Sequence, residues 1–334
     1  MGNVGQVRRR KILIAAGALL AAPAAVLAQA PQKLRRIGVL SLSVANSERA
    51  QWGRMVFAAS MRAVGYEEGQ NLAIEWRYAD GDVSRLPALA EELVRAKVEL
   101  IMATFNDAIA AAKGATSSIP IVMFNSINPV ERGFVQSLAR PGGNLTGTAW
   151  SAPEVSGKIL QVLHEAAPRA KRIALIGNTA MPGVHEYAVA AVKGASSMGM
   201  ETRVFPIVRP EETLKVLEQI AAYKPHALDV GLDTITMVGL ADIVAFAQKH
   251  KLPAIGNVSL FTDAGGMLCY GPDLKELGER TAGYVAKILG GARPADLPVE
   301  LPTRFELVVN LKTAKLIGHK IPQSILLRAD RVIE

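Results

Sequence analysis

The sequence contains one cysteine, Cys269, among 334 residues, and aromatic residues make up only 5% of it. A single cysteine cannot form a disulfide within the chain, so a small fold held together by disulfides is excluded. Cys269 lies in the apolar stretch 267–270, where we expect a buried small side chain and not a reactive thiol. Half of the residues are hydrophobic, which excludes disorder, and the length is enough for two domains of ordinary size.

Acidic residues are absent from the N-terminal part of the chain. Arg8, Arg9, Arg10 and Lys11 follow one another, whereas the first acidic residue is Glu48. The formal net charge is +8, but without these four cations the chain has 34 basic against 30 acidic residues. So small an excess is ordinary, and we therefore expect no nucleic-acid partner.

An apolar run of residues 12–22 comes directly after these cations, and no later run approaches the length of a membrane span. Pro23 and the small-residue stretch 24–30 follow it, which is the order of a secretory signal peptide. Val26 and Ala28 fit the small residues required before a cleavage site, so we predict cleavage after Ala28 and a periplasmic mature protein. The export route stays open between the general secretory (Sec) and twin-arginine pathways. An uncleaved membrane anchor is disfavoured, because the run is short and is followed by a proline.

Beyond residue 34, short apolar runs alternate with amphipathic helical patterns. Within 86–94, apolar residues recur every three to four positions, which is the spacing of one helix face, with Ser84 as a candidate cap and Pro87 in the first turn. Strands are predicted at 37–42, 72–76, 100–103 and 121–124, and again at 173–177, 202–206, 227–231 and 253–256, with helices at 184–198, 211–223 and 239–250. This alternation predicts parallel sheets covered on both faces. The similar openings of 35–40 and 171–176 hint at two related lobes.

The connections between the lobes are marked by turn-forming residues. The cluster 139–144 precedes a short extended piece, 145–150, which we interpret as a crossover strand. A later helix begins at Asp273, with Glu276 in capping-box spacing, and has no strand partner in the second series. We therefore predict that the chain returns to the first lobe near residue 271 and crosses again near 292–298. The predicted fold is α/β, with two parallel-sheet Rossmann-like lobes joined by a three-crossing hinge around a ligand cleft. The predicted parts are a signal peptide at 1–28, a first lobe at 34–149 plus about 272–294, and a second lobe at 150–271 plus about 295–334.

Several long motifs occur in an order that resembles one protein family. They are Asn-Pro-Val at 128–130 with Leu-Ala-Arg-Pro-Gly-Gly-Asn-Leu-Thr-Gly at 138–147, Tyr-Gly-Pro-Asp-Leu at 270–274, and the stretches 294–300, 305–314 and 321–330. From about residue 34 to its end, the chain resembles the solute-binding proteins of ABC uptake systems of the tryptophan/tyrosine type. The resemblance implies a type I periplasmic binding fold, a small-molecule ligand, no catalysis and no cofactor. It also implies a monomer that delivers its ligand to a membrane permease with a cytoplasmic ATPase.

Two departures from the family pattern concern the ligand. At 127–129 the chain has Ile-Asn-Pro where the family has Gly-Asp-Pro, so a neutral amide replaces an acid that would balance a ligand cation. At 178–182 it has Asn-Thr-Ala-Met-Pro in place of an Asn-Pro turn. An amino acid and an aromatic or other small carboxylate therefore both remain open as ligands.

Motifs of other function classes are missing. There is no phosphate-binding G-x-x-x-x-G-K-[ST], no G-x-G-x-x-G after the first strand and no G-x-S-x-G. The five histidines are scattered without metal-ligand spacing, so we expect no metal site. A transcription regulator would begin with a helix-turn-helix instead of an export signal. A secreted sensor that feeds a signalling partner remains an alternative, and so does a secreted hydrolase, because catalytic triads are not local in sequence.

Candidate ligand contacts are the polar residues that follow the predicted strands, because ligands of open α/β sheets bind beyond the carboxyl ends of strands. In the first lobe these are Ser41, Ser43, Thr104, Phe105, Asn106, Asn125, Ser126 and Asn128, and in the second lobe Asn178, Asp233 and Asn257. We expect Trp150, at the crossover, and Tyr270, at the return, to wall the cleft. Helix capping uses the same residue types at the same places and is the alternative for each. A buried Asp233 carboxylate would need a cation, either a ligand ammonium or a nearby Arg or Lys.

Overall fold

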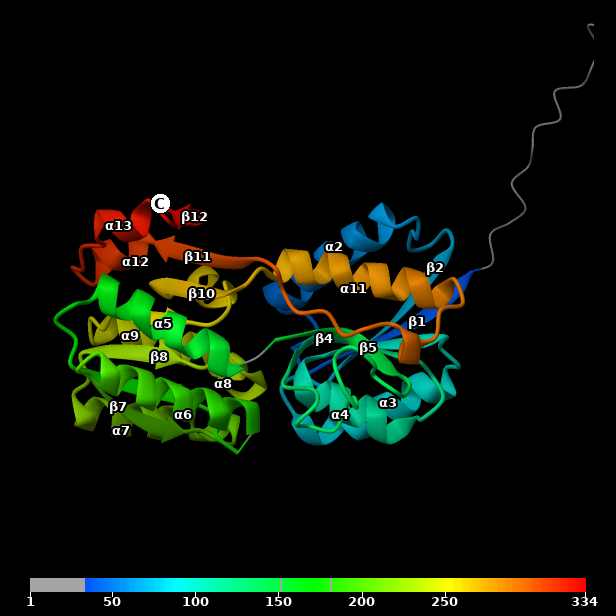
Figure 1. Cartoon of the computed structure of the whole chain (residues 1–334), viewed down its shortest axis with the longest axis horizontal. Coiled ribbons are helices and arrows are strands. Elements are labelled where there is room, and N and C mark those ends of the chain that lie inside the picture. Colours follow the sequence, from blue (N-terminus) through cyan, green and yellow to red (C-terminus); the bar gives the residue numbers. More distant parts are fainter. Residues whose placement is uncertain (1–33, 151, 181) are drawn as a thin grey trace, which may run out of the picture. The chain divides into compact units, whose positions relative to one another are not determined.

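Two sheets organise the chain in the computed structural model, which describes residues 34–150, 152–180 and 182–334 (Figure 1). The predicted signal peptide lies outside the described residues. Residues 35–334 form one compact unit. The first sheet has five parallel strands in the order β2-β1-β3-β4-β5. Its strands are β1 (Arg35–Ser41), β2 (Leu72–Tyr78), β3 (Leu100–Thr104), β4 (Ile121–Ile127) and β5 (Leu145–Trp150).

Helices cover both faces of the first sheet, as continuous apolar strands require. On one face lie α2 (Glu48–Ala63) and α11 (Leu274–Leu289), which pack against each other (Figure 1). On the other face lie α3 (Leu86–Arg95), preceded by the 3₁₀ helix η1 (Val83–Arg85), and α4 (Phe105–Ala115). Neighbouring residues of β1 point to opposite faces of the sheet. Val39 belongs to the apolar cluster that contains Phe57 of α2, and Leu40 belongs to the cluster that contains Leu93 of α3.

The second sheet has seven strands in the order β12-β11-β10-β9-β8-β6-β7. The five strands β7-β6-β8-β9-β10 of this sheet follow the same order as the five strands of the first sheet. This supports the prediction that the two lobes are related. The pairing of β10 with β11 is antiparallel, and the other recorded pairings in this sheet are parallel. The strands are β6 (Arg172–Gly177), β7 (Glu201–Pro206), β8 (Ala227–Val230), β9 (Ala254–Gly256), β10 (Leu268–Pro272), β11 (Phe305–Asn310) and β12 (Arg331–Ile333).

The helices of the second sheet are likewise divided between two apolar clusters. One cluster contains residues of α5 (Ala152–Ala166), α6 (Pro182–Ser197), α12 (Leu311–Leu316) and α13 (Gln323–Leu326). The other contains residues of α7 (Thr213–Tyr223), α8 (Thr234–Val238), α9 (Leu240–Lys249) and α10 (Leu260–Asp263). The 3₁₀ helices η2 (Pro210–Glu212) and η3 (Pro294–Asp296) complete the elements. No helix in the described part of the chain is long and apolar enough to cross a membrane.

The sequence-based elements agree with the structure in type and differ at some ends. All eight predicted strands are present, and Cys269 is fully buried in β10, where burial raises the pKa of its thiol. Asp82 and not Ser84 caps η1 before α3. The helix predicted at 239–250 is preceded by a separate helix, α8, which Asp233 caps. Asp273 caps α11 as expected, but the Glu276 carboxylate bonds Arg280 instead of closing a capping box.

The position of the last crossing differs from the prediction. Glu300 bridges to Thr148 beside β5, and the Val299 N–H donates to the Leu138 carbonyl at 2.7 Å. The segment 295–300, predicted from the sequence to belong to the second lobe, therefore lies against the first sheet. The crossing falls between Glu300 and the start of β11. The stretch that follows η3 is short and is interrupted by Pro298 and Pro302, so its partner strand was not readable from its sequence.

The family-like motifs are explained by close packing of the scaffold. Gly147 has φ of +133°, and a Cβ there would lie 2.3 Å from the Met123 carbonyl oxygen. A Cβ at Gly271 would lie 1.8 Å from the Asn257 carbonyl oxygen. The Asn144 amide donates to the carbonyls of Thr116 and Ile119 at 3.2 and 2.8 Å. These residues hold neighbouring strands and loops together.

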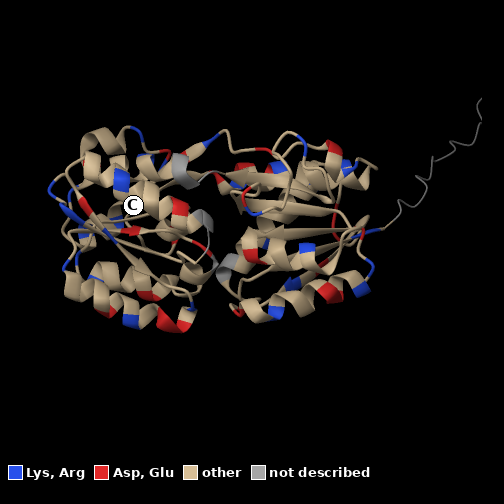
Figure 2. Cartoon of the chain, turned by 60° about the horizontal axis from the view of Figure 1, so that its bottom comes forward, with Lys and Arg blue, Asp and Glu red and all other residues tan. Residues whose placement is uncertain are grey.

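Charged residues of both signs are interspersed along the described elements (Figure 2). Most of the arginines of the first sheet are paired, as in Arg35 with Glu99 and Arg77 with Glu92. Among the described residues, no group of His, Cys, Asp and Glu side chains is arranged to hold a metal ion.

One buried carboxyl makes the stability depend on pH. Asp229 in β8 is fully buried, and its two oxygens accept the Tyr187 hydroxyl at 2.8 and 2.9 Å. Burial raises the pKa of Asp229 from its ordinary value of 3.8 to about 7. The folded protein thus holds this proton more tightly than the unfolded chain does, so ionisation of Asp229 favours unfolding increasingly as the pH rises from about 4 to about 7.

We predict that Asp229→Asn removes this loss of folding stability at rising pH. The unfolding free energy of the variant relative to the parent should rise by about 2 to 4 kcal/mol between about pH 4 and about pH 8, measured by urea denaturation. The exposed Asp242→Asn is the matched control and should leave the pH profile unchanged. A parallel pH profile for Asp229→Asn and the parent would contradict the assignment.

Candidate functional site

The first sheet has a crevice where its strand order reverses. β1 lies between β2 and β3, so the chain leaves β1 toward one side and β3 toward the other, and the carboxyl ends of these strands face an open space. Ser41 and Ser43 follow β1, and Thr104 and Phe105 follow β3. All four line one hollow, so the structure brings together four of the residues singled out from the sequence.

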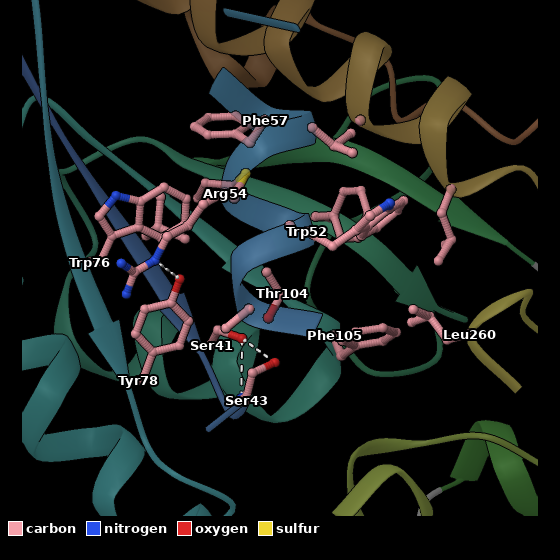
Figure 3. A pocket seen from close by; sticks show the side chains of 18 residues that line it. Ser41, Ser43, Trp52, Arg54, Phe57, Trp76, Tyr78, Thr104, Phe105 and Leu260 are labelled. Carbon is pink, nitrogen blue, oxygen red and sulfur yellow. Dashed lines mark hydrogen bonds between the residues drawn. The ribbon is translucent and has the colours of Figure 1, made fainter. Parts of the chain in front are cut away.

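The walls of this hollow are aromatic (Figure 3). Trp52 and Phe57 come from α2, Trp76 and Tyr78 from β2, and Phe124 from β4. The hollow encloses about 730 Å³, including its open mouth. Few aromatic residues occur in this chain, so their collection at one site points to a ligand with a ring or another flat apolar part.

Arg54 is the one charged residue among those that line this hollow in the described chain. Its Nε donates to the Tyr78 hydroxyl at 2.9 Å, and its guanidinium carbon lies 4.8 Å from the Tyr78 ring centroid and 5.4 Å from that of Trp76. The Trp76 and Tyr78 rings are parallel within 3°, with centroids 5.9 Å apart. The guanidinium is therefore held against a two-ring wall by cation–π contact and one hydrogen bond.

Phe105 enters the hollow on a strained backbone. Its φ is +58°, a conformation that is unusual for a bulky residue, and it begins α4 directly after β3. Its ring meets that of Phe124 edge to face, with centroids 6.4 Å apart and planes at 87°. Strain of this kind occurs where function fixes a side chain. Figure 3 shows Phe105, Trp52 and Leu260 on one side of the hollow and Arg54 with Trp76 and Tyr78 on the other.

A second hollow extends from the same strand ends toward the helices of the second sheet. Ser41, Ser43, Thr104 and Phe105 line it together with residues of α8 and α9, namely Met237, Val238, Leu240 and Ala241. It encloses about 970 Å³, including its mouth. The four shared residues thus lie where both hollows meet.

The corresponding crevice of the second sheet is closed by a carboxylate. Asp233 follows β8, and its Oδ2 accepts the Asn178 N–H, beyond β6, at 2.8 Å. Its Oδ1 accepts the N–H groups of Ile235 and Thr236 at 2.7 and 3.0 Å, which caps α8. Backbone donors therefore satisfy Asp233, where the sequence suggested a cation. Burial raises the pKa of Asp233 to about 6, and these N–H donors oppose the rise.

Other candidates tie the loops of the first sheet to one another. The Asn106 amide donates to the Ile127 carbonyl and accepts from the Ser126 hydroxyl and the Ile127 N–H, at 2.9 to 3.0 Å. The Asn125 N–H donates to the Thr148 hydroxyl at 3.2 Å, while the buried Asn125 Oδ1 has no hydrogen-bond partner. Asn106 and Ser126 are thus used internally, and Asn125 keeps a free acceptor.

Three further candidates, Asn257, Trp150 and Tyr270, lie outside both hollows. Asn257 accepts the Leu232 N–H at 3.0 Å and so fixes the loop after β8. Trp150 is 3% exposed within the cluster under α5. Tyr270 stacks on Phe305, with centroids 5.9 Å apart. Both aromatic side chains thus have packing contacts with the second sheet, and their role as walls of the ligand cleft stays a prediction.

Asn128 links the first sheet to α6 of the second. Its φ is +49°, which asparagine tolerates, and its side-chain amide donates to the Glu186 carboxylate. Arg132, four residues later, has Asp107 and Glu186 as the carboxylates that act on its charge, and its Nε and Nη2 are buried without hydrogen-bond partners among the described residues. Burial lowers the pKa of Arg132, and the two carboxylates oppose this. That Asn128 contacts a ligand stays a prediction.

Sequence reasoning missed the aromatic wall and Arg54 because it searched only the strand ends. Trp76 and Tyr78 are two residues apart on an edge strand and therefore share a face. Arg54 and Phe57 are three apart on a helix and therefore share a face as well. A search for ring-rich faces next to a predicted switch point would have found these four residues.

Two sheets that share a five-strand parallel order, with an aromatic hollow at a switch point, define the class of two-lobed small-molecule binding proteins. The comparisons with known proteins agree. Residues 53–333 match the family described as ABC transporter substrate binding protein, and the chain therefore belongs to this family. It binds the substrate of such a transporter, as the motifs at 128–147 and 270–274 implied.

Individual proteins are similar to most of this chain. A tyrosine-binding protein of Clostridioides difficile (strain R20291) is 28% identical over 294 residues, which covers 86% of this chain and 81% of that protein. A conserved domain protein of Vibrio cholerae has a TM-score of 0.82 at 24% identity, covering 90% of this chain and 100% of the other. A Streptococcus pneumoniae ABC domain in complex with L-Trp has a TM-score of 0.81 at 24% identity, covering 90% and 99%. These structures confirm the expected type I periplasmic binding fold.

The contact between Asn128 and Glu186 can be tested by exchanging the amide and the carboxylate between the two positions. Asn128→Asp sets two carboxylates against each other and should lower the unfolding free energy at neutral pH by about 1 to 3 kcal/mol. Adding Glu186→Gln should restore most of this loss, because the new amide donates to the new carboxylate. Asn128→Gly keeps the left-handed backbone, removes only the amide, and is the control for simple loss of the bond. A double variant no more stable than Asn128→Asp alone, in thermal or urea unfolding, would disprove the contact.

Proposed function

We propose that this chain is a periplasmic binding protein that captures a small ring-containing ligand in the aromatic hollow lined by α2 and β2 and delivers it to an ABC importer. The observation that carries the proposal is the aromatic hollow at the switch point of the first sheet, with Arg54 on its wall. The rings supply apolar contact, and the hydroxyls of Ser41, Ser43 and Thr104 supply polar contact. The tyrosine named for one relative and the L-Trp bound to another support a ring in the ligand.

We further propose that each sheet with its helices acts as one lobe. In the described chain the connections between them follow β5 and β10 and precede β11. Such connections act as hinges, and a ligand that touches both lobes favours the closed arrangement. The second hollow, shared by Thr104 and Val238, is where this joint contact would form.

The remaining parts of the proposal concern the role of the protein in the cell. The mature protein acts as a monomer, without catalysis, and its partners are a membrane permease and the cytoplasmic ATPase of the same transporter. No specific observation favours the sensor or the hydrolase alternative.

The most direct test of this function is native mass spectrometry of the protein purified from its own periplasm. We expect a retained small molecule that is released unchanged on denaturation. Turnover of the bound compound would instead support an enzyme. A protein that carries no ligand and binds none of the small aromatic compounds supplied to it would contradict the proposal.

Binding should also be visible through the tryptophans. Two of the three, Trp52 and Trp76, line the hollow, so a saturating ligand should change the intrinsic fluorescence. Trp52→Phe should reduce this change, whereas Trp150→Phe, outside the hollow, should preserve it. The same ligand should decrease the radius of gyration in X-ray scattering. A bound ligand that leaves both signals unchanged would rule out closure around this hollow.

Export makes a separate prediction. The periplasmic protein should begin at Gln29, because cleavage follows Ala28, and the intact mass should report this. Replacing Arg9 and Arg10 by lysine should block export only if the twin-arginine route is used. A protein found in the cytoplasm at full length would contradict the predicted location.

A further inference from the structure

Among the residues that the structure describes, the hollow is lined by one positive charge and no negative one, and this specifies the charge of its ligand. We propose that the site selects aromatic carboxylates that lack an α-ammonium group, with Arg54 as the group that binds the carboxylate. The inference rests on the proposed function and names the substrate class of the same site.

The first step is that Arg54 is available. Six arginines of the elements from β1 to α3 each pair with a carboxylate, namely Arg35, Arg36, Arg62, Arg77, Arg85 and Arg95. Arg54 has no such partner among the described residues, and only its Nε is used, by the Tyr78 hydroxyl. The two Nη groups are therefore left to bind a ligand, and their planar arrangement matches the two oxygens of a carboxylate.

The second step is that the rings hold this cation in place. Trp76 and Tyr78 present two parallel faces to the guanidinium, and Phe57 meets Trp76 edge to face at 6.2 Å. A guanidinium fixed in this way loses less freedom on binding an anion than an exposed arginine does. The ligand ring then has the opposite side of the hollow, with Trp52 and Phe105, as its contact surface.

The third step is that nothing acidic lines either hollow in the described chain. The acidic residues that follow neighbouring strands are engaged elsewhere. Asp80, after β2, accepts the Ala45 N–H and pairs with Arg85 at 2.8 Å. Asp233, after β8, is satisfied by backbone donors, and Glu186 is bonded by Asn128. An α-ammonium brought into this space would lose water without gaining an anionic partner.

The experiment compares matched pairs of ligands by calorimetric titration of the mature protein. The pairs are 3-(4-hydroxyphenyl)propionate against L-tyrosine and indole-3-propionate against L-tryptophan, which differ only by the ammonium group. We expect the acid of at least one pair to bind at least about tenfold more tightly than its amino acid. Equal or tighter binding of both amino acids would overturn the inference and leave the proposed function standing.

The role of Arg54 is tested against an uncharged ligand of the same shape. The parent should bind the acid at least about tenfold more tightly than the corresponding primary amide, and Arg54→Gln should bring this ratio close to one. Arg54→Lys should retain part of the preference. Arg62→Gln, on the same helix and outside the hollow, is the matched control and should leave the ratio unchanged.

The outcomes separate a binding role from a structural one. If Arg54 only supports the rings, Arg54→Gln weakens acid and amide equally and the ratio persists, which overturns the inference. If no member of either pair binds, the inference is also overturned. The proposed function then stands or falls with the ligand that native mass spectrometry finds on the periplasmic protein.

Discussion

Where the strand order of a parallel sheet reverses, the backbone and side-chain polar groups at the strand ends face a crevice and need partners. The two sheets of this protein differ at this crevice, which is closed by a side chain in one and open in the other. In the second sheet, Asp233 spans the crevice and accepts backbone N–H groups from both of its sides. In the first sheet, Ser41, Ser43 and Thr104 border an open hollow. The rest of the site depends on this difference, because an open crevice is what allows a ligand to enter.

The open crevice is also asymmetric in charge. Its cation is held by rings and a phenol, whereas the acidic groups of the surrounding loops are bound to backbone donors, to arginines or to Asn128. One similar protein is named a tyrosine-binding protein and another was solved in complex with L-Trp, and both of these amino acids are zwitterions. The aromatic wall fits the ring of either kind of ligand. The charge of Arg54, with no acidic residue lining the hollow in the described chain, favours an anionic ligand over a zwitterion.

The fold was readable from the sequence because parallel strands buried on both faces form continuous apolar runs, as at 100–103 and 121–124. β11 and β12 were not predicted, because β11 pairs antiparallel with a strand far away in sequence and β12 is only three residues long. The last crossing was misplaced for a similar reason, since Glu300 finds its partner beside β5 through tertiary contact alone.

The site was predictable only in part. Strand ends could be located, so Ser41, Ser43, Thr104 and Phe105 were found, and the structure gathers them in one hollow. Their neighbours Asn106 and Asn257 have the same residue types at equivalent places, yet they bind the protein's own backbone. Residue type alone does not separate a cap from a ligand contact. The aromatic wall was missed because Trp76 and Tyr78 lie within an edge strand and Arg54 lies within a helix, away from any strand end.

The most direct test of this account is a crystal structure of the mature protein with 3-(4-hydroxyphenyl)propionate. We expect the ligand carboxylate about 3 Å from the Arg54 Nη atoms, with the ligand ring between the aromatic residues of the hollow. A carboxylate bound elsewhere, with Arg54 still facing only Tyr78 and Trp76, would contradict it.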